Sequence, residues 1–169
     1  WGHELCGMTG EAEWEAHPSR GEYYLLDKSS GKLVSHVIFQ CPTAAGKRVL
    51  VSPTVHGNLI VGPNAEDVAA PDCKENTLAG MDMVAATSRK SVPGVDFRQS
   101  IRNFAGVRAN TNEKDFIIRP AKNMPRMLHA AGIKSPGLSA APAIGEYAVE
   151  LLGKMGLALE RKPDWNGKR

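Results

Sequence analysis

Residues 132–146 read GIKSPGLSAAPAIGE, a glycine-rich turn that leads directly into an alanine-rich helix. Gly137 lets the backbone approach a flat ligand closely, and Ser139 has the side chain of a helix N-cap. A helix N-terminus carries about half a positive charge, which would stabilise an anion that develops on such a ligand. The same residues also suit an ordinary strand–turn–helix junction, so residue chemistry alone leaves both interpretations open.

The chain on either side of this turn predicts regular structure. Downstream, apolar residues recur at helical spacing on one face, and the tail 160–169 is polar. Upstream, residues 115–120 and 126–131 have the composition of two short strands. The apolar stripe of the helix consists of Ile144, Tyr147, Ala148, Leu151, Leu152 and Met155.

The first half of the chain alternates strand formers with turn signals. We expect strands over 21–27, 33–40, 47–53 and 59–62, arranged as an antiparallel meander that is open to a ligand on one face. A helix over 77–91 and one long strand over 97–109 follow. The predicted fold class is therefore mixed α/β (α+β), with an antiparallel sheet in its first part.

Composition limits the possible functions. The 169 residues are 42% hydrophobic and 23% charged, which is typical of a globular protein, and the net charge of +3 is too small and too scattered to indicate nucleic acid binding. The three cysteines are widely spaced without a CxxC, so neither a disulfide framework nor a metal centre is predicted, and a reducing cytoplasm is expected. No apolar run approaches the length of a membrane span.

Three polar residues have positions suited to an anionic substrate. Arg108 ends the long strand, where a guanidinium can hold a carboxylate or phosphate through two hydrogen bonds, or can simply face solvent. His56 lies in a turn, either to accept a substrate proton or as an exposed turn residue. Arg20, at the start of the first strand, is either an anion ligand or a plain surface charge.

Four segments, taken in this order and spacing, resemble one known family. They are RGEY at 20–23, PTVHGNLIVGP at 53–63, FAGVR at 104–108 and AAGIKSPGLSAAPAIGE at 130–146. Together they are similar to the C-terminal part of FAD-dependent oxidoreductases of the glycerol-3-phosphate dehydrogenase and D-amino-acid oxidase (DAO) superfamily. The family's N-terminal nucleotide-binding turn, a GxGxxG between a strand and a helix, is not found in the 169 residues.

The resemblance implies a domain organisation and a set of site residues. Residues 1–16 would end an N-terminal flavin-lobe segment, 17–96 would form a substrate cap, 97–162 would return to the FAD-binding lobe, and 163–169 would be a tail. His56 and Arg108 would be catalytic, and Arg20, Arg108 and Lys134 would bind substrate. The cofactor would contact Gly132, Ser135, Pro136, Gly137, Leu138 and Ser139.

The function that the resemblance implies is oxidation of a small hydroxy acid, polyol phosphate or amino acid by hydride transfer to FAD. We expect the isolated chain to be inactive and to lose FAD, because the nucleotide-binding segment is missing. The tail motif KPDWN at 162–166 resembles the end of the flavoprotein domain in longer relatives, so the electron acceptor is expected to be an iron–sulfur module, a quinone or oxygen. The alternatives from other classes are a non-catalytic small-molecule-binding module and a purely structural one.

Overall fold

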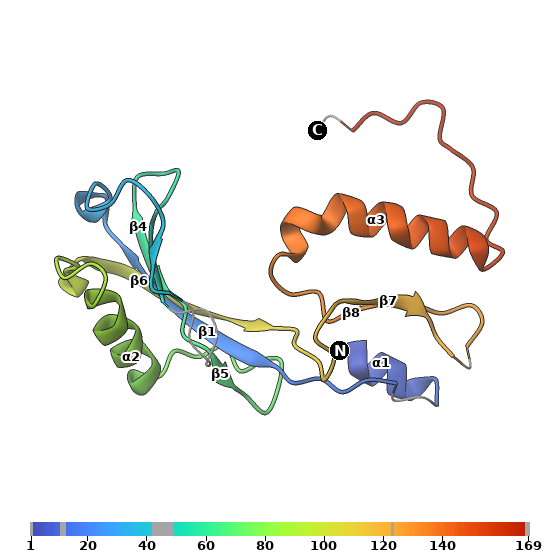
Figure 1. The fold of residues 1–169 in the computed structure, drawn as a ribbon, viewed down its shortest axis with the longest axis horizontal. Helices are drawn as coiled ribbons and strands as arrows, with labels where there is room; N and C mark the ends of the chain where they lie inside the picture. Colours follow the sequence, from blue (N-terminus) through green and yellow to red (C-terminus); the bar gives the residue numbers. More distant parts are fainter. Residues whose placement is uncertain (1, 11–12, 42–48, 123, 168–169) are drawn as a thin grey trace. The chain divides into compact units, whose positions relative to one another are not determined.

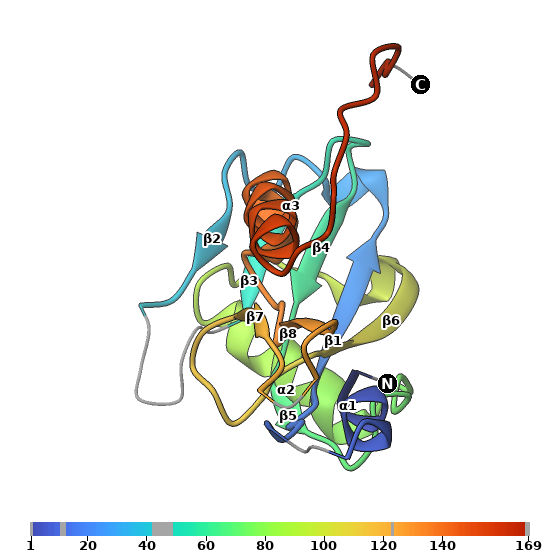
Figure 2. The same ribbon diagram turned by 90° about the vertical axis from the view of Figure 1, so that its right-hand side faces the viewer.

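The computed structural model describes residues 2–10, 13–41, 49–122 and 124–167. The chain divides into two compact units, one formed by His17–Ala109 and the other by Trp1–Ala16 together with Asn110–Arg169 (Figures 1 and 2). Both contain helices and antiparallel strands, which confirms the mixed α/β class. None of the described helices is long and apolar enough to cross a bilayer.

The 17–109 unit is built on a six-stranded antiparallel sheet. The central strand β1 pairs along one edge with β4 and β5, and along the other edge with β6. The strand order β2-β3-β4-β1-β5 differs from a sequential meander, because β1 pairs with β4 rather than with β2. The strands are β1 (Ser19–Leu26), β2 (Ile38–Phe39), β3 (Leu50–Pro53), β4 (Leu59–Gly62), β5 (Glu66–Asp67) and β6 (Ser100–Arg108).

Helix α2 (Leu78–Arg89) covers one face of this sheet (Figure 1). Thr77 begins the helix as its N-cap, with its hydroxyl accepting a hydrogen bond from the Gly80 amide at 3.1 Å. The core between helix and sheet consists of aliphatic side chains with little or no exposure, which is where most of the stabilising burial of this unit lies. These side chains are Leu26, Val49, Val51, Leu59, Val61, Val84 and Val95.

The other unit combines two helices with a strand pair. Helix α1 (Gly2–Met8) precedes the link to β1, and strands β7 (Ile117–Pro120) and β8 (Leu128–Ala131) pair antiparallel. Helix α3 (Gly137–Lys154) packs on this pair and has only Gly137 fully buried (Figure 1). A small core of Cys6, Trp14 and Ile117 joins α1 to β7.

The structure differs from the sequence expectations at several element boundaries. Strand β2 has two residues instead of the eight expected over 33–40, and residues 47–48 of the expected third strand lie outside the described residues. Residues 97–99 form a short 3-10 helix, as do residues 28–30. The expected domain boundary after residue 96 also differs, since β6 pairs with β1 along its whole length and groups with the 17–109 unit.

Candidate functional site

The two arginines at the shared end of β1 and β6 lie on opposite faces of the sheet. Arg108 pairs with Ser19, whereas Arg20 pairs with Val107, and successive side chains of a strand point to opposite faces. Arg20 therefore lies on the face covered by α2, and Arg108 on the other face. The sequence prediction that both hold substrate is tested by what each guanidinium contacts.

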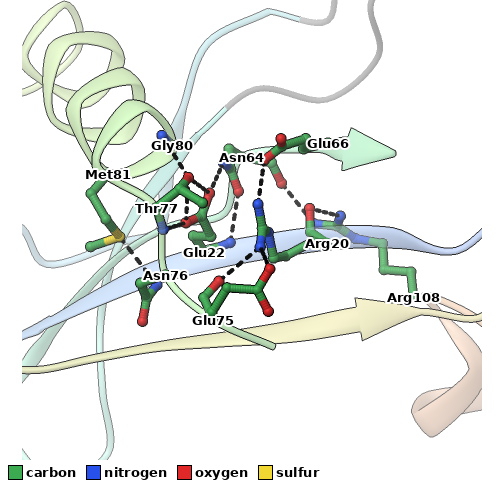
Figure 3. A network of polar contacts seen from close by, with 10 residues as sticks. All are labelled: Arg20, Glu22, Asn64, Glu66, Glu75, Asn76, Thr77, Gly80, Met81 and Arg108. Atoms are coloured by element: carbon green, nitrogen blue, oxygen red, sulfur yellow. Dashed lines mark hydrogen bonds and ion pairs between the residues drawn. The ribbon is translucent and has the colours of Figure 1, made fainter. Parts of the chain in front are cut away.

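Arg20 is buried, and both of its terminal nitrogens pair with carboxylates that are themselves partly exposed (Figure 3). Its Nη1 donates to Glu75 Oε1 at 2.6 Å, and its Nη2 donates to Glu66 Oε2 at 2.8 Å. The hydrogen bond to Glu66 raises the pKa of the Arg20 guanidinium above its ordinary value. Because two acidic side chains neutralise its charge, Arg20 ties β5 and the segment before α2 to β1, and the geometry favours this structural role over substrate binding.

Arg108 is half-buried and is held by main-chain carbonyls instead of acids. Its Nη1 donates to the Arg20 carbonyl at 3.3 Å, and its Nη2 donates to the Asn64 carbonyl at 3.0 Å. Among the described residues, no carboxylate lies within ion-pair distance of this guanidinium. The two carbonyls therefore fix the direction of the Arg108 guanidinium. Its positive charge and three of its five N–H donors stay available to an anion.

Beside Arg108, the exposed backbone of Gly106 lies next to two aromatic rings. Gly21 and Gly106 are paired directly across β1 and β6, and a Cβ added to Gly106 would have no atom within 4 Å. On the same face, the rings of Tyr23 and Phe104 stack with centroids 5.0 Å apart and an interplanar angle of 9°. A guanidinium, two glycines and a stacked aromatic pair together can bind a small organic anion through charge and through apolar contact.

Glu22 is a buried acidic residue beside the Arg20–Arg108 end of the sheet that the sequence analysis did not single out. Its carboxylate is completely buried and accepts hydrogen bonds from the Asn64 side chain and from the backbone and hydroxyl of Thr77 (Figure 3). It therefore lies directly at the N-terminus of α2, where negative charge is stabilised. The sequence does contain a signal for this residue: an acidic side chain in the middle of an aromatic and aliphatic strand. Such a carboxylate, when buried, requires hydrogen-bond partners.

His56 does not meet Arg108. It lies exposed in the turn between β3 and β4, where the Asn58 side chain donates to the Leu26 carbonyl at the far end of β1. Arg108 is at the opposite end, beside Ser19. The two ends of β1 (Ser19–Leu26) are seven residue steps apart, which is roughly 23 Å at 3.3 Å per residue. The two residues that the family resemblance makes catalytic therefore lie at opposite ends of the sheet and do not open onto one small-ligand cleft.

The loop 132–139 has the backbone features that a flavin contact needs. Gly132 has a positive φ of 65°, and a Cβ on buried Gly137 would lie 2.5 Å from Ile133 Cγ2, so both positions require glycine. Helix α3 begins at Gly137 without a side-chain cap, which corrects the expectation that Ser139 is its N-cap. The first-turn amides of Leu138 and Ser139 lie outside the intrahelical ladder and can donate to an acceptor.

These features fit the pyrimidine edge of FAD. The exposed amides at the start of α3 would face the carbonyl oxygens of that ring, and the helix dipole has the sign that favours added negative charge there. Ser135 and Pro136 are exposed at the loop surface, and Leu138 has 93% of its side chain exposed. Lys134 is half-exposed on the same loop.

Comparison with known proteins identifies the family of the chain. The model of the DAO family, described as FAD dependent oxidoreductase, matches residues 1–151. A glycerol 3-phosphate dehydrogenase of Caloramator mitchellensis is 44% identical over 98% of the chain, and a glycerol 3-phosphate oxidase of Mycoplasma genitalium is 38% identical over 96% of it. The chain spans 35% and 42% of the length of these two relatives.

The fold is also found in solved structures. An L-alpha-glycerophosphate oxidase from Mycoplasma pneumoniae with FAD bound superposes with a TM-score of 0.86 at 34% identity, covering 99% of this chain and 44% of that one. A glycine oxidase from Bacillus cereus superposes with a TM-score of 0.74 over 92% of this chain and 41% of that one, at 16% identity, which shows the shared fold alone. The match over residues 1–151 leads to the conclusion that the chain belongs to the DAO family of FAD-dependent oxidoreductases.

Proposed function

We propose that this chain supplies the substrate cap and the C-terminal part of the flavin lobe of a dehydrogenase or oxidase that acts on a small anionic alcohol, with glycerol 3-phosphate as the first candidate. The observation that carries the proposal is Arg108, whose guanidinium is aimed by two carbonyls and has no acidic partner among the described residues. The relatives named for glycerol 3-phosphate support this choice of substrate.

In this proposal each group has a defined task. Bound FAD supplies the hydride acceptor. Arg108 holds the anionic end of the substrate in two hydrogen bonds, so that the substrate has one orientation instead of many. Gly106 leaves room for the substrate beside the guanidinium, and the amides at the start of α3 donate to the flavin edge.

Three further assignments belong to the proposal. Lys134 is a candidate second cation for a substrate phosphate, supported by its exposure on the loop before α3. The electron acceptor is a quinone, oxygen or an iron–sulfur partner. Cys41 and Cys73 are free thiols, and the three cysteines are widely spaced without a CxxC, which favours a reducing, cytoplasmic location.

The test is Arg108→Lys in the FAD-loaded, full-length enzyme. A Lys keeps the charge but loses the planar fork, so both turnover and apparent affinity for glycerol 3-phosphate should fall, by a total of about 2–5 kcal/mol in transition-state stabilisation. Flavin content should stay at the wild-type level. Arg98→Lys is the matched control, because Arg98 is 88% exposed and paired with Asp96. Wild-type kinetics for the Arg108 variant would refute the proposed clamp.

A further inference from the structure

The edge of β1 that faces β4 and β5 contains a gap. Strand β4 pairs with residues 24–26 of β1 and strand β5 pairs with residues 19–20, so no strand of the described part of the chain pairs with residues 21–23 on this side. The backbone amide of Glu22 falls in the gap and is buried. It donates instead to the side-chain Oδ1 of Asn64 at 2.7 Å. The Asn64 side chain therefore replaces a missing strand.

The contact uses only the side chain of Asn64, so its main-chain carbonyl can accept a hydrogen bond from another donor. That carbonyl accepts the hydrogen bond from Arg108 Nη2 at 3.0 Å. Asn64 cannot easily turn away, because it is only 5% exposed and its Nδ2 donates to the Glu22 carboxylate. Glu22 is itself held by Thr77 at the start of α2. Thr77, Glu22, Asn64 and Arg108 therefore form a continuous series of hydrogen-bonded residues from the start of α2 to the guanidinium (Figure 3).

We propose that Asn64, locked by Glu22, is a positioning residue that aims the Arg108 guanidinium at the anionic end of the substrate. The inference rests on the proposed function of Arg108 as the anion clamp. It assigns the Glu22–Asn64 pair a role in substrate affinity beyond holding the sheet together. The role is specific, because the contrasting Arg20 is aimed by carboxylates that would cancel its charge.

The experiment measures inorganic phosphate as a competitive inhibitor of glycerol 3-phosphate oxidation by the full-length, FAD-loaded enzyme. The variants are Asn64→Ala, Arg108→Lys and the two combined. Asn64→Ala keeps the carbonyl that accepts from Arg108 but removes the side-chain hydrogen bonds that fix its position, so it should weaken phosphate inhibition roughly tenfold, with flavin content unchanged. In the Arg108→Lys background, Asn64→Ala should weaken phosphate inhibition by less than about twofold. The reason is that Asn64 acts only by positioning the Arg108 guanidinium, which this variant lacks.

A swapped pair keeps the test decisive even if Asn64→Ala does not fold. Asn64→Asp places two carboxylates side by side and should weaken phosphate inhibition, whereas Glu22→Gln combined with Asn64→Asp restores one carboxylate and one amide. The double variant keeps every hydrogen bond of the pair and should return phosphate inhibition to within about threefold of wild type.

The outcomes separate the two proposals. If Arg108→Lys leaves phosphate inhibition unchanged, the proposed function of Arg108 fails and the positioning role fails with it. If Arg108→Lys weakens inhibition but Asn64→Ala and Asn64→Asp do not, only the positioning role is overturned. A swapped pair that recovers thermal stability without recovering phosphate inhibition also overturns it, because the pair would then serve the fold alone.

Discussion

The Arg108 guanidinium lies directly over Gly21: a Cβ added to Gly21 would be 2.6 Å from Arg108 Nη2 and 2.9 Å from the Pro63 Cβ. Glycine at this position is what allows the arginine to cross the central strand and reach the carbonyls of Arg20 and Asn64. The neighbouring Gly106, paired with Gly21 across β1 and β6, has open space above it.

This relationship predicts different effects for two matched substitutions. Gly21→Ala must displace both the flexible end of Arg108 and the Pro63 ring, so it should lower thermal stability and weaken phosphate inhibition of the full-length enzyme roughly tenfold through lost charge-assisted contacts. Gly106→Ala should leave both thermal stability and the Arg108 contacts unchanged. Equal phosphate inhibition in the Gly21→Ala variant and in wild type would show that Arg108 can bind phosphate without crossing β1 at Gly21.

The buried Glu22 predicts a stability effect at the start of α2. A Cβ on Gly80 would lie 1.6 Å from Glu22 Oε2, so Gly80→Ala must push the carboxylate away from Thr77 and Asn64. We expect a loss of about 1–3 kcal/mol in the free energy of unfolding, measured by urea denaturation of the 169-residue chain.

A second helical glycine provides the control for that measurement. Gly145 in α3 is exposed, and a Cβ there would have no atom within 4 Å. Gly145→Ala should raise the free energy of unfolding by about 0.5–1 kcal/mol, because alanine loses less backbone entropy in a helix. A Gly80 variant as stable as the Gly145 variant would contradict the packing described for Glu22.

The ion pair between Glu113 and Arg119 predicts a pH dependence of stability. Arg119 donates to both Glu113 oxygens, at 2.7 and 2.8 Å, and this hydrogen bonding lowers the pKa of Glu113 below its ordinary value. A carboxyl whose pKa is lowered on folding stabilises the protein above its unfolded pKa, and this contribution is lost as the pH falls through the folded pKa.

The pair can be tested by comparing wild type with Arg119→Gln. The variant should be less stable at about pH 7, and the difference should shrink as the pH falls through the lowered pKa of Glu113 in the folded protein. Lys154→Gln is the control, because its pair with Glu150 is mostly exposed and should contribute little at either pH. A constant stability difference for the Arg119 variant across this range would show that the side chain acts through packing.

The cofactor loop predicts weak flavin retention by the chain alone. The loop 132–139 offers contacts to the ring edge, but the 169 residues contain no GxGxxG turn, whose amides hold the pyrophosphate in such proteins. The purified chain should show little absorbance in the flavin region, and FAD added in excess should wash out on gel filtration. Stoichiometric flavin after purification would contradict this expectation.

Much of the molecule was predictable from local sequence. Strand β4 begins and ends at Leu59 and Gly62 as expected, and α2 and α3 follow their apolar periodicity, because each element is encoded by spacing within a few residues. The family was also identifiable from four short motifs, since such motifs encode backbone turns and close approaches that only particular residues permit.

The roles of the charged residues depended on pairing between distant segments. Arg20 and Arg108 look alike as strand-end arginines, but strand register places them on opposite faces, and only there does one meet Glu66 and Glu75 while the other meets carbonyls. Strand pairing also separates His56 from Arg108, because the turn between β3 and β4 lies at one end of β1 and the end of β6 lies at the other. Sequence alone determined the elements and the family, whereas tertiary structure decided which charge is neutralised and which stays available, because register joins residues that no local spacing relates.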